Sequence, residues 1–180
     1  KAADYYLDME GHRAWFEALH HLVNARKYKE AAKIAVDRGW ELISKGYLEE
    51  FQALLNDIDL ADIAPETKGE LHLVRARISD IIGEWDNALD NYKEAQLLIK
   101  EPARQVVSFW NIGWILQKRK DWEGAMVTIW RAVGTFPEIS LWPVDVVRSV
   151  RFHKDLLVAA QFAGMGDAAK PNAMVPLEML

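Results

Sequence analysis

Apolar residues recur along most of the chain with the spacing of an amphipathic helix. Trp15, Leu19 and Leu22 form one such stripe, and Phe109, Ile112 and Leu116 form another. No stretch alternates polar and apolar residues over a useful length, as a half-buried strand would. We therefore predict an all-α chain, with helices over residues 2–9, 12–25, 28–45, 47–57, 66–82, 84–99, 102–119, 121–134 and 144–163.

Glycine and proline residues separate the predicted helices. Pro102 suits the first turn of a helix, whereas a glycine is typical of the residue that follows a helix end. Pro171 and Pro176 argue against a further full helix, so residues 171–180 are predicted to be a tail. The clearest breaks are Gly11, Gly46, Gly83 and Pro102.

A short motif occurs three times, directly after a polar turn. It consists of an aromatic residue followed three positions later by alanine, at residues 28–31, 85–88 and 122–125. In the later two copies another alanine lies seven residues further on, and a small residue lies twelve residues before the motif's alanine. Small side chains at fixed intervals are expected where two helices of a repeated hairpin touch.

This pattern resembles the tetratricopeptide repeat (TPR), a helical hairpin of about 34 residues. The resemblance implies a right-handed superhelix of antiparallel hairpins (α-α superhelix). The first gap between motifs is long enough for an extra helix, residues 47–57, and a fourth hairpin begins before Ala168 but does not finish. We expect one continuous solenoid, with an N-terminal helical arm over residues 1–65, TPR-like hairpins over 66–170 and the tail over 171–180.

The first hundred residues also resemble the helical arm of MalT-like STAND regulators. The resemblance rests on helix-packing positions, among them residues 2–6, 12–16, 18–22 and 40–48. In that family the arm joins a nucleotide-binding module to a TPR-like sensor. No glycine here is followed by lysine, so the phosphate-binding loop G-x-x-x-x-G-K-[ST] is absent. The resemblance therefore implies the sensing part of a larger signalling or transcription-regulating protein.

Composition narrows the possible functions. The chain has 180 residues, 51% of them hydrophobic and 27% charged, which excludes disorder over most of its length. With 22 Lys and Arg against 27 Asp and Glu, the net charge is −5, and the two basic runs, residues 26–29 and 118–120, lie at turns. A repeated basic stripe is missing, so we expect no nucleic-acid partner and no membrane partner. Because there is no cysteine and no membrane-spanning segment, a cytoplasmic location is predicted.

Residues for catalysis do not gather into a recognisable pattern. The five histidines include no pair at i, i+4, and no serine lies in a G-x-S-x-G motif. Paired carboxylates such as Glu66 and Glu70 are typical of a solvated helix face. We therefore predict a protein that is not an enzyme, with no metal and no cofactor.

Binding is expected on the first helix of each hairpin, which lines the concave groove in TPR proteins. Trp110 and Trp114 share one helix face, as a binding hot spot would require, although both could instead pack into the fold. The leading hypothesis is recognition of a protein or peptide; the alternatives are small-molecule sensing on these tryptophans and a purely structural spacer. The predicted partner-binding residues are Trp110, Trp114, Arg77, Asp80, Gln117, Lys118 and His153.

Overall fold

The structure, a computed structural model, describes residues 2–7 and 11–135. Every regular element in these two ranges is an α-helix, and each begins and ends within two residues of its predicted bounds. The helix predicted over residues 144–163, the unfinished fourth hairpin and the tail lie outside the described residues. The helices are α1 (Ala2–Leu7), α2 (His12–Asn24), α3 (Tyr28–Ser44), α4 (Leu48–Asn56), α5 (Pro65–Ile82), α6 (Trp85–Leu98), α7 (Pro102–Lys118) and α8 (Trp122–Thr135).

The chain divides into two compact units. The first unit covers residues 1–100 and holds α1 to α6, and the second begins at residue 101 and holds α7 and α8. The predicted domain limits at residues 65 and 170 remain predictions.

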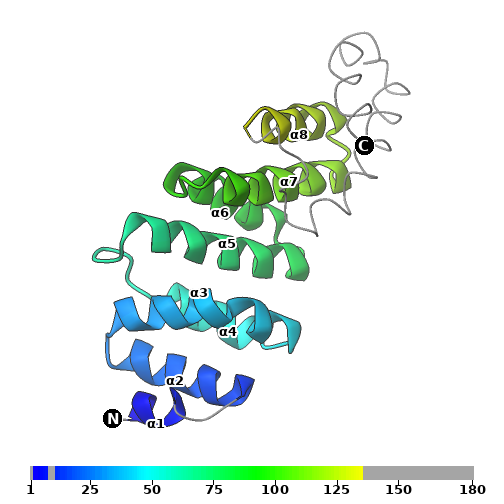
Figure 1. The fold of residues 1–180 in the computed structure, drawn as a ribbon. Helices are drawn as coiled ribbons and strands as arrows, with labels where there is room; N and C mark the ends of the chain where they lie inside the picture. The colour runs from blue at the N-terminus through cyan, green and yellow to red at the C-terminus, as the bar shows by residue number, and fades with distance from the viewer. Residues whose placement is uncertain (1, 8–10, 136–180) are drawn as a thin grey trace. The chain divides into compact units, whose positions relative to one another are not determined.

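In the first unit the helices form a stack (Figure 1). α1 packs against α2, α2 against α3, and α3 against both α4 and α5, while α5 and α6 form a hairpin. A continuous apolar core runs through α1 to α5, because each helix contributes a buried stripe at three- and four-residue spacing. Its fully buried members include Leu19, Leu42, Phe51, Leu71 and Ile78.

The residues of the repeated motif are wholly or partly buried. Ala31, Ala88 and Ala125 are fully buried, and the aromatic residues that begin the later two motifs, Trp85 and Trp122, are half-buried. α7 and α8 form a hairpin like that of α5 and α6. The motif alanines are therefore buried in all three copies, and their place at a contact between two helices stays a prediction.

Four helix ends share one turn geometry. In each, the residue two positions before the next helix has a positive φ, and its N–H donates to the carbonyl three residues earlier. The following N–H donates to the carbonyl five residues earlier, which completes a Schellman motif, with N···O distances between 2.8 and 3.3 Å. The left-handed residues are Arg26, Gly46, Gly83 and Lys120, with φ of 57°, 87°, 86° and 64°.

Polar side chains tie the extra helix α4 to the α5–α6 hairpin. The Arg75 guanidinium on α5 donates to the carbonyl of Leu55 at the end of α4, and burial lowers the pKa of Arg75. Just after the end of α5, the Glu84 carboxylate accepts a hydrogen bond of 3.1 Å from Gln52 on α4. The first contact reaches a backbone carbonyl in the last turn of α4, and the second joins two side chains.

Candidate functional site

Arg77 and Asp80, two of the predicted binding residues, form an ion pair on α5. The Arg77 Nη1 atom lies 3.2 Å from Asp80 Oδ2, and the side chains are 37% and 3% exposed. A carboxylate this deeply buried requires a charged partner, which Arg77 supplies. Arg77 therefore spans the boundary between the buried Asp80 and solvent.

Tyr92 on α6 lies close to this ion pair. The sequence analysis did not predict this residue as part of the site. The residue is 1% exposed, and the charges of Asp80 and Arg77 both act on its hydroxyl. Burial raises the pKa of Tyr92, the negative charge of Asp80 raises it further, and Arg77 opposes both effects. A tyrosine in an amphipathic helix gives no sign in the sequence that its hydroxyl will face an ion pair.

The two tryptophans on α7 differ in exposure. Trp110 is 7% exposed and Trp114 is 37% exposed, although they are one helical turn apart. The Lys118 ammonium lies 5.4 Å from the centre of the Trp114 ring, Lys118 itself is exposed, and Gln117 is half-buried. Trp114 and Lys118 are thus the predicted α7 residues with the most accessible surface.

The structure does not place all of the predicted binding residues together. Arg77 and Asp80 belong to the first unit, Trp110, Trp114, Gln117 and Lys118 belong to the second, and His153 lies outside the described residues. The approach of the α5 pair to the α7 pair therefore remains a prediction.

Leu73, Val74 and Asn111 lie on α5 and α7, the helices that carry most of the predicted binding residues. Leu73 and Val74 are buried, and the Asn111 amide donates to the Val107 carbonyl of its own helix at 2.8 Å. Within residues 2–7 and 11–135 no group of three His, Cys, Asp or Glu residues could hold a metal ion. None of the described helices is long and apolar enough to cross a membrane.

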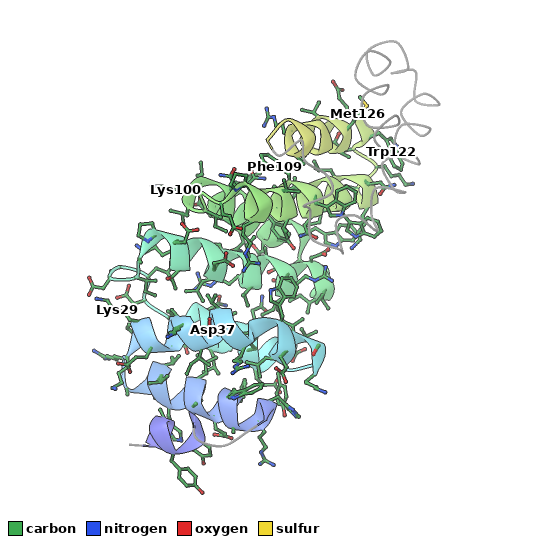
Figure 2. The ribbon with its side chains drawn as sticks, in the orientation of Figure 1. Lys29, Asp37, Lys100, Phe109, Trp122 and Met126 are labelled. Carbon is green, nitrogen blue, oxygen red and sulfur yellow. The ribbon has the colours of Figure 1, made fainter. Side chains whose placement is uncertain are left out.

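A hollow of about 440 Å³ lies between α2 and α3, and none of the residues predicted to bind lines it. Trp15 lines the hollow, and the Arg38 guanidinium lies 4.3 Å from the centre of the Trp15 ring. Asp37, labelled in Figure 2, marks its place on α3. The lining residues are Trp15, Leu22, Lys27, Glu30, Lys33, Ile34, Asp37 and Arg38.

Comparison with known structures identifies the fold. The chain is similar to the crystal structure of MamA protein, a TPR-like helical repeat protein, with a TM-score of 0.60 and 15% sequence identity. The match covers 92% of this chain and 79% of that chain. No family model and no curated protein matches the sequence. The prediction of an all-α, TPR-like fold is therefore confirmed.

Proposed function

We propose that this chain is a non-catalytic module that binds a protein or peptide. The observation that carries the proposal is Trp114, an indole that keeps 37% of its surface exposed beside an exposed lysine on a repeat helix. Tryptophan supplies a large rigid contact area and is enriched among the residues that dominate binding energy. A TPR-like stack of hairpins offers such side chains on an extended surface.

We propose contact residues in each of the two units by itself. On α7, Trp114 with Lys118 and Gln117 makes the first contact; on α5, Arg77 is held by Asp80 with its guanidinium partly in solvent. An arginine fixed by a buried carboxylate loses less side-chain entropy on binding than a free one. His153 and the buried Trp110 complete the set as the sequence analysis predicted it.

A sensor role within a larger regulator is the finer form of this proposal. It is supported by the resemblance of the first hundred residues to MalT-like arms, which rests on helix-packing positions in the sequence. In such a regulator, binding to the hairpins would be transmitted to a nucleotide-binding module elsewhere in the protein. A phosphate-binding loop in the flanking gene sequence would support this role, and its absence would contradict it.

The binding proposal is tested by partner capture followed by titration. The wild-type chain is used to capture and identify a partner, and the purified partner is then titrated against wild type, Trp114→Ala and Trp40→Ala. Trp40 is the matched control, because it is 48% exposed but lies on α3. We expect Trp114→Ala to weaken binding by more than about 2 kcal/mol, the scale of a hot spot, and Trp40→Ala to leave it unchanged.

Folding is measured on the same samples by circular dichroism and urea unfolding. Equal binding by a folded Trp114→Ala variant would remove Trp114 from the binding surface. Loss of helicity in that variant would instead show that Trp114 stabilises the fold.

A further inference from the structure

Two side chains of the hollow between α2 and α3, the guanidinium of Arg38 and the indole of Trp15, lie against each other. Arg38 lies 4.3 Å from the Trp15 ring centre, within the range of a cation–π contact. A guanidinium that rests on an indole keeps its in-plane N–H groups available for a carboxylate. Leu22 and Ile34 supply apolar surface beside this pair. The hollow can therefore hold a carboxylate and an apolar group at the same time.

Charge along the first unit distinguishes this hairpin from the rest of the unit. Residues 12–45 carry seven Lys and Arg against four Asp and Glu, whereas residues 48–98 carry four against twelve. Of the two acidic side chains in the hollow, Glu30 is already paired with Lys27 at 2.9 Å. The α2–α3 hairpin is thus a positive surface in a chain of net negative charge, which favours an acidic occupant.

We propose that the Trp15–Arg38 hollow docks an acidic peptide segment that carries an aromatic or large aliphatic side chain. A carboxylate of the segment is bound by the Arg38 guanidinium, and the apolar side chain packs on Trp15 and Ile34. Lys33 at the rim attracts the remaining negative charge of the segment. This surface lies on α2 and α3 and does not depend on the α7 contact proposed above.

The experiment uses three dye-labelled synthetic peptides and the full chain. The first peptide is rich in glutamate and has one central phenylalanine, the second replaces phenylalanine by alanine, and the third replaces glutamate by lysine. Fluorescence anisotropy measures binding to wild type, Arg38→Gln and Trp15→Leu. Arg13→Gln and Trp40→Leu are the matched controls, because both residues are exposed on the same two helices and lie outside the hollow.

We expect the first peptide to bind wild type and to bind more weakly as salt is added. Arg38→Gln and Trp15→Leu should each weaken binding by about tenfold, a difference of about 1.4 kcal/mol, while the two controls bind as wild type does. The alanine peptide should bind more weakly than the phenylalanine peptide, and the lysine peptide should not bind.

Three results would overturn the proposal. The first is absence of binding by the acidic phenylalanine peptide, and the second is equal binding by all five proteins. The third is that the wild-type protein self-associates in analytical sedimentation and that Arg38→Gln abolishes this association. The acidic α4–α6 surface of a second copy would then occupy the hollow. Circular dichroism of each variant separates loss of binding from loss of fold.

Discussion

Arg26 and Lys120 have the same backbone conformation at the same point of two separate turns. Each lies two residues before a helix, and their φ angles are 57° and 64°. Glycine occupies this position in the other two turns of the same kind, at Gly46 and Gly83. The Schellman hydrogen bonds hold all four residues in the left-handed region, which costs an L-residue other than glycine about 1–2 kcal/mol.

Substituting these two residues by glycine should stabilise the protein. In Arg26→Gly and Lys120→Gly the left-handed strain disappears, while the unfolded chain gains freedom that costs about 0.5–1 kcal/mol. We expect each variant to gain about 0.5–1 kcal/mol in the free energy of unfolding, measured by urea denaturation.

Lys45 provides the control for these variants. It precedes Gly46 in the same kind of turn, but its φ of −90° lies in the right-handed region. Lys45→Gly should therefore destabilise the protein, because only the entropic cost of glycine remains. A loss of stability in all three variants would contradict the strain argument.

The helices could be predicted from the sequence because their signals are local. Apolar spacing, Gly46, Gly83 and Pro102 place the boundaries to within two residues, and the recurring alanines mark buried positions of the paired helices. The left-handed Arg26 and Lys120 were missed, since neither is glycine. Alignment of the turns on the following aromatic residue would have placed both in the column of Gly83.

The candidate site could be predicted only in part, because burial depends on residues far apart in sequence. Trp110 and Trp114 share a helix face, yet the first is 7% exposed and the second 37%. Helical spacing predicts which face of the helix a side chain lies on, but not how much of that side chain other residues cover. The contact pairs Trp15, near the start of α2, with Arg38, in the second half of α3. No short sequence motif encodes this pairing.

Gly69 lies where α5 meets the end of α6, and we expect Gly69→Ala to destabilise the protein. An added Cβ atom would lie 2.6 Å from Ile99 Cγ1 and 3.1 Å from Leu98 Cβ, so the two segments would have to move apart. Overpacking of this kind costs about 1–3 kcal/mol in the free energy of unfolding. A double-mutant cycle with Ile99→Ala measures the clash directly, and purely additive effects would show that it does not exist.

Ala88 and Ala125 test the repeated motif in the two hairpins. Both are fully buried at helix contacts, so Ala88→Leu and Ala125→Leu should each lower the free energy of unfolding by about 1–3 kcal/mol. Ala53→Leu on α4 is the control, because Ala53 is exposed and leucine fits a helix surface. Unchanged unfolding midpoints in both motif variants would show that these alanines do not set the distance between the helices.

Tyr92 should make stability fall at high pH. Burial and the charge of Asp80 raise the pKa of Tyr92, so above about pH 10 the hydroxyl ionises in the unfolded chain but not in the folded one. The unfolded state then binds fewer protons than the folded state, and the free energy of unfolding falls by up to about 1.4 kcal/mol per pH unit.

Tyr92→Phe should remove this part of the slope in urea titrations between about pH 9 and 11. At neutral pH the same variant should differ from wild type by no more than about 1 kcal/mol, the net contribution of one hydrogen bond. Tyr5→Phe is the control, since Tyr5 is 64% exposed, and a slope in Tyr92→Phe equal to that of wild type would show that the Tyr92 hydroxyl ionises in the folded protein.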